Sequence, residues 1–90
     1  MKRQPIIHTL KIVTPHFGYI RDGLKDFEIC FDDRDFYVGD LLIIQEHSYN
    51  KKGKPVPTGE SIERTIKHIL RKFKGLMTGY IILGMEKNDE

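Results

Sequence analysis

Alternating apolar and polar residues predict several short β-strands along the chain. The alternation is clear over residues 8–13 and 25–31, and the run YIILGM predicts a last strand over residues 79–85. The run LLIIQE at residues 41–46 is nearly continuously apolar. Because that run has no regular polar side, we expect its strand to be buried on both faces.

One short helix is predicted between the first two strands. Thr14 can accept a hydrogen bond from a free backbone N–H, and Pro15 suits the first helical position, so this pair is typical of a helix start. The helix is expected to run to about Asp22, because Gly23 readily adopts the left-handed conformation that ends helices.

Residues 61–71 fit two patterns. Their apolar positions have helical spacing, whereas their β-branched residues favour a strand. The strand at residues 41–46 needs a hairpin partner, so we predict a strand here, preceded by a long Pro- and Gly-containing loop at residues 49–59. The side chains expected to be mostly buried are Leu10, Ile12, Phe17, Ile20, Phe27, Ile29, Leu41, Ile43, Ile66 and Ile82.

The predicted order is therefore β-α-β-β-β-β with antiparallel hairpins. This order indicates a mixed α/β, mainly β fold: a small, partly closed β-barrel with one helix after the first strand. The length of 90 residues, with 39% hydrophobic and 31% charged residues, is typical of a single globular domain.

The single cysteine, Cys30, excludes an intramolecular disulfide and any metal site built from several thiolates. A reducing cytoplasm is the compartment we expect. The N-terminal apolar run is short and interrupted, so no signal peptide is expected, and no stretch approaches the roughly 20 apolar residues that span a bilayer. We expect no membrane partner.

Charge is unevenly distributed although the formal net charge is only +2. Residues 26–46 carry seven acids and one base, whereas residues 51–74 carry eight bases and two acids. Such asymmetry favours a local basic face, although the same charges can also be scattered over a solvated surface.

The stretch with Gly23, Lys25 and Glu28, followed by DDRDFYVGD at residues 32–40, resembles the signature G-x-K-x-x-E-x-R of the activating-signal-cointegrator homology (ASCH) family. The opening HTLKI and the closing GYIILGM are similar to its small bacterial and phage branch, and the resemblance covers about residues 8–85. It implies one PUA-like β-barrel domain spanning residues 1–90, a cleft beside the helix, and RNA or a modified nucleoside as ligand.

Two positions depart from that pattern. Cys30 stands where the family signature has Arg, and Glu28 stands where a branch that deacylates an acetylated cytidine carries Thr. An enzymatic role would therefore have to use Lys25 and Glu28 as the acid–base pair.

Lys25 and Glu28 can be interpreted in two ways from their chemistry. A lysine can hold a phosphate while the neighbouring carboxylate accepts a hydrogen bond from a base amino group. The alternative is an ion pair that caps the sheet. Arg34, among three aspartates, is similarly either an ion-pair anchor of its turn or a phosphate contact.

The basic segment supplies four further candidates for phosphate contacts: Lys67, Arg71, Lys72 and Lys74. His8 is the histidine expected nearest the cleft, with a structural role as the default. Cys30 is interpreted as a small apolar filler, and Tyr37 and Tyr49, beside turns, are candidates for stacking on bases. No metal or other cofactor is expected, because the histidines lack zinc-ligand spacing.

Three functions follow from these residues. The first is an RNA-binding or nucleotide-ligand-binding module that uses a cleft at Lys25 and Glu28 and the basic segment for phosphates. The second is a small amidohydrolase acting on a modified nucleoside. The third is a protein-interaction adaptor that uses the loop at residues 49–59. The oligomeric state stays open.

Overall fold

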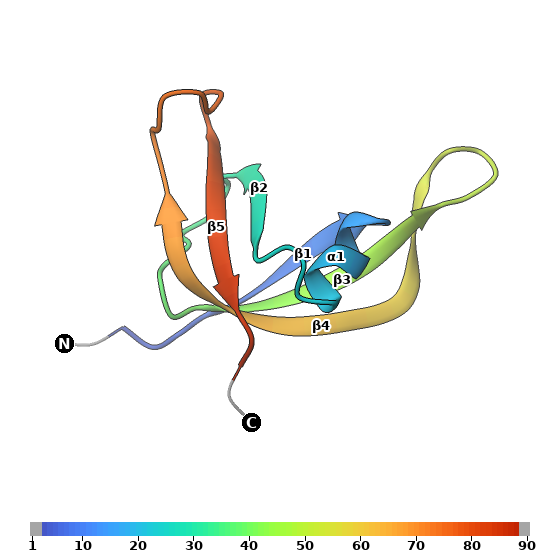
Figure 1. Ribbon diagram of the computed structural model, residues 1–90, viewed down its shortest axis with the longest axis horizontal. Coiled ribbons are helices and arrows are strands. Elements are labelled where there is room, and N and C mark those ends of the chain that lie inside the picture. The colour runs from blue at the N-terminus through green and yellow to red at the C-terminus, as the bar shows by residue number, and fades with distance from the viewer. Residues whose placement is uncertain (1–2, 89–90) are drawn as a thin grey trace.

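A computed structural model describes residues 3–88 of the chain (Figure 1). The elements in chain order are β1 (Ile7–Val13), α1 (His16–Arg21), β2 (Phe27–Phe31), β3 (Leu41–Tyr49), β4 (Pro55–Leu70) and β5 (Tyr80–Glu86). This order is the predicted one, and the prediction of a strand rather than a helix over residues 61–71 is confirmed.

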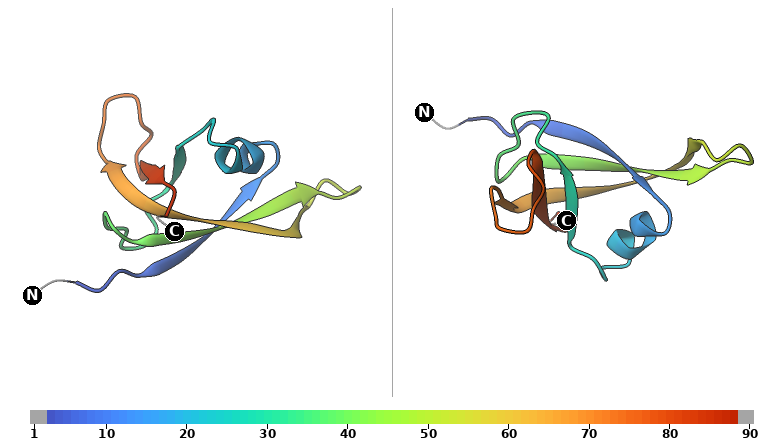
Figure 2. Two further views of the ribbon diagram at one scale, coloured as in Figure 1. Left: turned by 60° about the horizontal axis from the view of Figure 1, so that its bottom comes forward. Right: turned by 90° about the horizontal axis from the view of Figure 1, so that it is seen from above.

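The strands form one mixed sheet in the order β1-β3-β4-β5-β2. β1 and β3 are parallel, and the other three pairs are antiparallel. β4 has 16 residues and pairs with β3 through its first part and with β5 through its second part, so it bends between the two halves of the sheet (Figures 1 and 2). The mainly β fold with one short helix is confirmed, but β1 and β2 are the two edges of an open sheet.

The core lies on one face of this bent sheet. Its buried apolar side chains are Leu10, Ile12, Phe17, Ile20, Phe36, Leu42, Ile44, Ile66, Ile81, Leu83 and Met85. On β3 and β5 the fully buried positions are thus one residue away from the predicted Leu41, Ile43 and Ile82, which are partly buried. The shift by one residue follows from the alternation of strand faces.

The prediction that Phe27 and Ile29 are buried is wrong. Their side chains are 44% and 52% exposed, because β2 turns its other face, with Glu28 and Cys30, toward the core. Hydrophobicity alone favours the Phe-Ile-Phe face as the inner one. The register with β5 reverses that choice, because Glu28 and Cys30 pair with the buried Leu83 and Ile81.

Two local predictions are also corrected. α1 has Pro15 as its N-cap residue and no side-chain cap, so Thr14 does not cap the helix. Gly23 does adopt a left-handed conformation after α1, with φ +79°. The expected long loop at residues 49–59 is shorter, since residues 55–59 belong to β4.

Within the described residues, no helix is long and apolar enough to cross a membrane.

Candidate functional site

A buried carboxylate organises the end of the sheet where β1 begins. Asp40 is 1% exposed, and its carboxylate accepts hydrogen bonds from Arg3 at 2.6 Å and from His8 Nε2 at 2.7 Å. The backbone N–H groups of Ile6 and Tyr37 donate to the same carboxylate at 3.1 and 3.2 Å. Burial alone would raise the pKa of Asp40, but these four donors outweigh burial and hold its pKa well below the usual range.

His8 is therefore a satisfied structural histidine, the default role expected for it. Its ring also packs on Phe36, with the ring centroids 4.7 Å apart. Phe36 lines a neighbouring cleft, so His8 supports the wall of that cleft from behind and does not face it.

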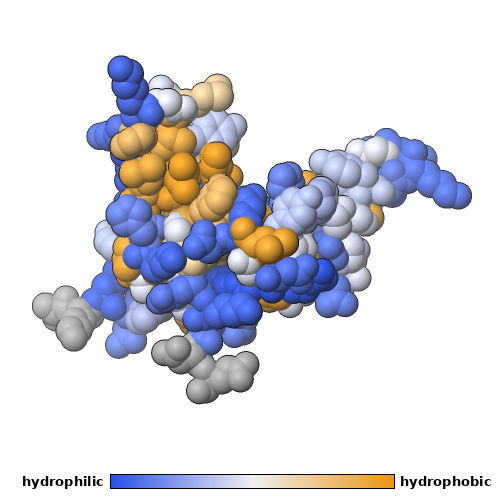
Figure 3. All heavy atoms as spheres, viewed as in Figure 1, coloured by the Kyte–Doolittle hydropathy of each residue, from blue (hydrophilic) through white to orange (hydrophobic). Residues whose placement is uncertain are grey.

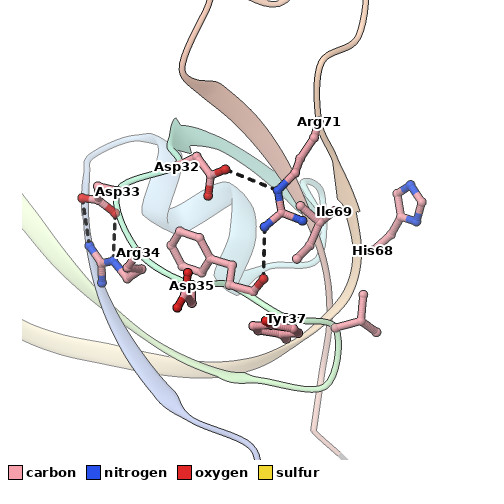
Figure 4. A pocket seen from close by; sticks show the side chains of 10 residues that line it. Asp32, Asp33, Arg34, Asp35, Tyr37, His68, Ile69 and Arg71 are labelled. Carbon is pink, nitrogen blue, oxygen red and sulfur yellow. Dashed lines mark hydrogen bonds and ion pairs between the residues drawn. The ribbon is translucent and has the colours of Figure 1, made fainter. Parts of the chain in front are cut away.

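That cleft has a volume of about 910 Å³ and lies between the β2–β3 connection and the end of β4 (Figure 4). Arg34 pairs with Asp33 at 2.9 Å and donates to the carbonyl oxygen of Thr9. Arg71 pairs with Asp32 at 3.3 Å and donates to the carbonyl oxygen of Phe36. Both guanidinium groups are engaged by their own chain, so Arg34 and Arg71 anchor this connection.

The charge of the cleft also disfavours a polyanion. Its lining includes three carboxylates, from Asp32, Asp33 and Asp35, against the two guanidinium groups. Although this cleft is large and contains two arginines, its excess of carboxylates disfavours the binding of phosphate.

Lys25 and Glu28 do come together, in the ion pair that is one of the two interpretations of their chemistry. Lys25 Nζ lies 2.6 Å from Glu28 Oε1, and the two side chains are 17% and 18% exposed. The turn after α1 makes this contact possible: Gly23 has a positive φ, and the backbone N–H of Lys25 donates to the carbonyl oxygen of Tyr19. This turn brings Lys25 back toward the first inward-facing residue of β2.

A shallow groove of about 280 Å³ lies beside Lys25, between the end of α1 and the strands β4 and β5. Its charged lining comprises the cations Lys25, Arg64, Lys67 and Lys87 and the carboxylates Asp26 and Glu86. We call these four cations and their surroundings the basic groove. Because the cations outnumber the carboxylates, this groove favours an anionic ligand.

Two of these cations were not among the predicted site residues. Arg64 is positioned by α1, since its Nη2 donates to the carbonyl oxygen of Ile20 at 3.0 Å, and burial lowers its pKa. Lys87 follows β5. Neither residue lies near Lys25 in sequence, so only the sheet order brings them to one groove.

The predicted basic segment does not form one continuous surface. Lys67 lies in the basic groove, where it pairs with Asp26 at 3.5 Å. Lys72 and Lys74 lie in the loop between β4 and β5 and line a separate hollow. Arg71 is held by Asp32 in the cleft described above. The expectation that these four residues lie together is therefore wrong for Lys67, which lies in the basic groove, whereas Arg71 lines the same hollow as Lys72 and Lys74.

Cys30 faces the core and packs against it, which agrees with its interpretation as an apolar filler. Burial, followed by the nearby carboxylates, raises the pKa of its thiol to about 11. The reactive species in alkylation is the thiolate.

We therefore expect iodoacetamide to label Cys30 slowly at neutral pH in the folded protein and rapidly in urea, as measured by mass spectrometry. Fast labelling of the folded protein would contradict this environment.

Among residues 3–88, no three His, Cys, Asp or Glu side chains are arranged to hold a metal ion. The charged groups that line the basic groove are ammonium and guanidinium donors and the carboxylates of Asp26 and Glu86.

The fold and this groove define a small, mainly β domain with a cationic groove beside its helix. A family model described as "Domain of unknown function (DUF3850)" matches residues 7–85, and the chain belongs to this family. A comparison with the curated proteins finds no match.

Proposed function

We propose that the protein is an RNA-binding module of the PUA-like, ASCH type that holds phosphates in the basic groove. The observation that carries this proposal is the convergence on one groove of Lys25 from the α1–β2 connection, of Arg64 and Lys67 from β4, and of Lys87 after β5. The resemblance of the Gly23–Glu28 segment to the ASCH signature supports the same location.

The groove offers different donors to a phosphate backbone. Arg64 presents a planar guanidinium, and Lys67 presents a flexible ammonium group. The pair between Lys67 and Asp26 is long, and both side chains are well exposed, so it contributes little and exchanges readily for a phosphate.

Glu28 has a different role in this proposal. Glu28 does not itself line the groove, but its carboxylate is held by Lys25, which does, and in this proposal it accepts a hydrogen bond from the amino edge of a base. Phosphate contacts position the RNA without reading its sequence, whereas base contacts discriminate between nucleotides.

A Glu28→Gln variant should therefore change the nucleotide preference more than the overall affinity for RNA.

Charge reversal of Lys67 and Lys87 tests the groove. We expect the K67E/K87E variant to bind labelled single-stranded RNA at least roughly tenfold more weakly at low salt, because reversed charges repel the phosphates. The slope of log K against log salt should also decrease by about 1.4, since each lost phosphate contact on a single strand contributes about 0.7. Fluorescence anisotropy across a salt series measures both quantities.

The matched control is K51E/K52E, which makes the same charge change in the β3–β4 turn, far from the groove (Figure 1). A loss of equal size in this control would show that only net charge matters and would contradict a specific groove. If the wild-type protein binds no RNA even at low salt, the proposal fails. Turnover of a modified nucleoside that disappears in Lys25→Ala would then favour the hydrolase.

A further inference from the structure

The outer face of the sheet, opposite the core, carries an apolar surface. Phe27, Ile29 and Phe31 of β2 point outward, and the last of these is 55% exposed. Ile29 pairs across the strands with Ile82, and Phe31 pairs with Tyr80. We call Phe27, Ile29, Phe31, Tyr80 and Ile82 the outer apolar face. Figure 3 shows hydrophobic side chains gathered over β5 and the neighbouring strands.

Phe27, Ile29 and Phe31 stay 44%, 52% and 55% exposed, whereas Tyr80 and Ile82 are partly buried. The main contacts of α1 are with β1 and β3. A row of three large, half-exposed side chains along a five-residue strand has the size of the apolar patches that often serve as binding surfaces.

The aromatic rings on this face are arranged for stacking. The Phe31 and Tyr80 rings are stacked, with centroids 4.3 Å apart and an angle of 25° between their planes. Gly79 makes room for this arrangement, because a Cβ atom there would lie 3.2 Å from the Phe31 ring. Phe27, at the other end of β2, has the ammonium of Lys25 5.4 Å from its ring centroid.

Cations lie at both ends of this aromatic row. At the Phe27 end, Lys25 connects the outer apolar face to the basic groove. At the Phe31 end, the loop after β4 carries Lys72 and Lys74, which line a hollow of about 570 Å³ together with Tyr80. Asp26 and Asp32 also flank β2, but each is paired with a cation, Lys67 and Arg71 respectively.

The size of the face distinguishes between two occupants. Phe27, Ile29 and Phe31 are each about half exposed, so the row offers on the order of 300 Å² if a large side chain presents roughly 200 Å². A standard protein–protein interface buries about 800 Å² on each partner. The row is too small for a stable dimer of this chain, but it matches the area of a few bases.

We propose that the outer apolar face stacks the bases of unpaired RNA nucleotides, with Phe27 and Phe31 as the stacking residues and with phosphates held by the cations at the two ends of β2. This inference rests on the proposed RNA-binding function and adds the form of RNA that is bound. Single strands, whose bases are free to stack, are bound in preference to duplexes.

A comparison of normal and abasic RNA tests the stacking directly. The F27I/F31I variant places strand-favouring isoleucines at both positions, which should preserve the fold, and removes both rings. We expect it to bind a labelled oligouridine roughly tenfold or more weakly than the wild type, with an unchanged salt slope. An abasic oligonucleotide of equal length should bind the wild type weakly and should lose nothing further in the variant, because both changes remove the same contact.

The matched control is Tyr49→Ile. Tyr49 has a similar exposure, 59%, but it lies at the end of β3 beside the β3–β4 turn. Its replacement should leave oligouridine binding unchanged. A loss confined to Tyr49→Ile would place stacking at that turn and overturn the inference.

Three other outcomes also decide the question. If F27I/F31I binds oligouridine as the wild type does, stacking on this face is refuted while groove binding stands. If light scattering shows a wild-type dimer that becomes monomeric in F27I/F31I at unchanged RNA affinity, the face belongs to a second copy and the inference is overturned. If the wild type binds neither oligonucleotide at low salt, both this inference and the proposed function fail.

Discussion

Replacing Asp40 by alanine is expected to lower the free energy of unfolding by about 3 kcal/mol, because it leaves buried partners of a charged hydrogen-bond network without their acceptor. His8, itself 6% exposed, loses the carboxylate 2.7 Å from its Nε2, and the backbone N–H groups of Ile6 and Tyr37 lose theirs. Urea unfolding followed by circular dichroism measures the change. Asp35→Ala, an exposed aspartate in the same connection, should change the stability by less than about 0.5 kcal/mol.

The same network predicts a dependence of stability on pH. The pKa of Asp40 is lowered in the folded protein, so its contribution is fully present above the unfolded-state pKa of about 3.9 and is lost as the pH falls below that value. The stability difference between the wild type and Asp40→Asn should therefore narrow in acid. A constant difference between pH 7 and strongly acidic conditions would contradict this account of Asp40.

The sequence predicts the order of elements well because that order depends on local signals. The alternation at residues 8–13 and the β-branched residues at 61–71 each favour a strand wherever the strand lies in the sheet. Gly23 ends α1 through its own backbone freedom. The alternation and Gly23 need no knowledge of distant contacts, whereas residues 61–71 also fit a helix and are assigned to a strand because the strand at residues 41–46 needs a hairpin partner.

The sheet order is not a local property, and the errors follow from it. The row Phe27-Ile29-Phe31 is more apolar than the opposite row with Glu28 and Cys30, so hydrophobicity selects the wrong face of β2. The register of β2 with β5 reveals that the apolar row is outside, because Glu28 and Cys30 pair with the buried Leu83 and Ile81.

The residues of the basic groove are, like the fold, predictable from the sequence only where the contacts are local. Lys25 and Glu28 are close in sequence, and their contact depends on the turn at Gly23, because strand alternation alone would place them on opposite faces. Arg64 and Lys87 come from segments far from Lys25, and no spacing rule identifies them. From the sequence, Asp40 can be recognised only as a turn residue. The groups that donate hydrogen bonds to it come from the segment before β1, from β1 itself and from the β2–β3 connection.

Helix α1 connects the stability of the fold to the geometry of the basic groove. It has six residues, far fewer than the roughly 12 that an isolated helix needs, so tertiary packing must hold it in place. Phe17 and Ile20, each 1% exposed, supply that packing. The helix in turn positions two cations, since its carbonyl oxygens accept hydrogen bonds from the Lys25 backbone and the Arg64 guanidinium.

Phe17→Ala is therefore expected to lower the free energy of unfolding by about 4 kcal/mol through the cavity it leaves, and to weaken RNA binding by the molecules that stay folded. Phe17→Leu should cost less than about 1.5 kcal/mol and preserve binding, because it keeps most of the buried volume. Tyr19→Ala, on the exposed side of the same helix, should change stability little. The measurements are urea unfolding and anisotropy at a low temperature where Phe17→Ala remains folded. If Phe17→Ala is strongly destabilised but its folded fraction binds RNA with wild-type affinity, then α1 stabilises the fold without positioning the groove.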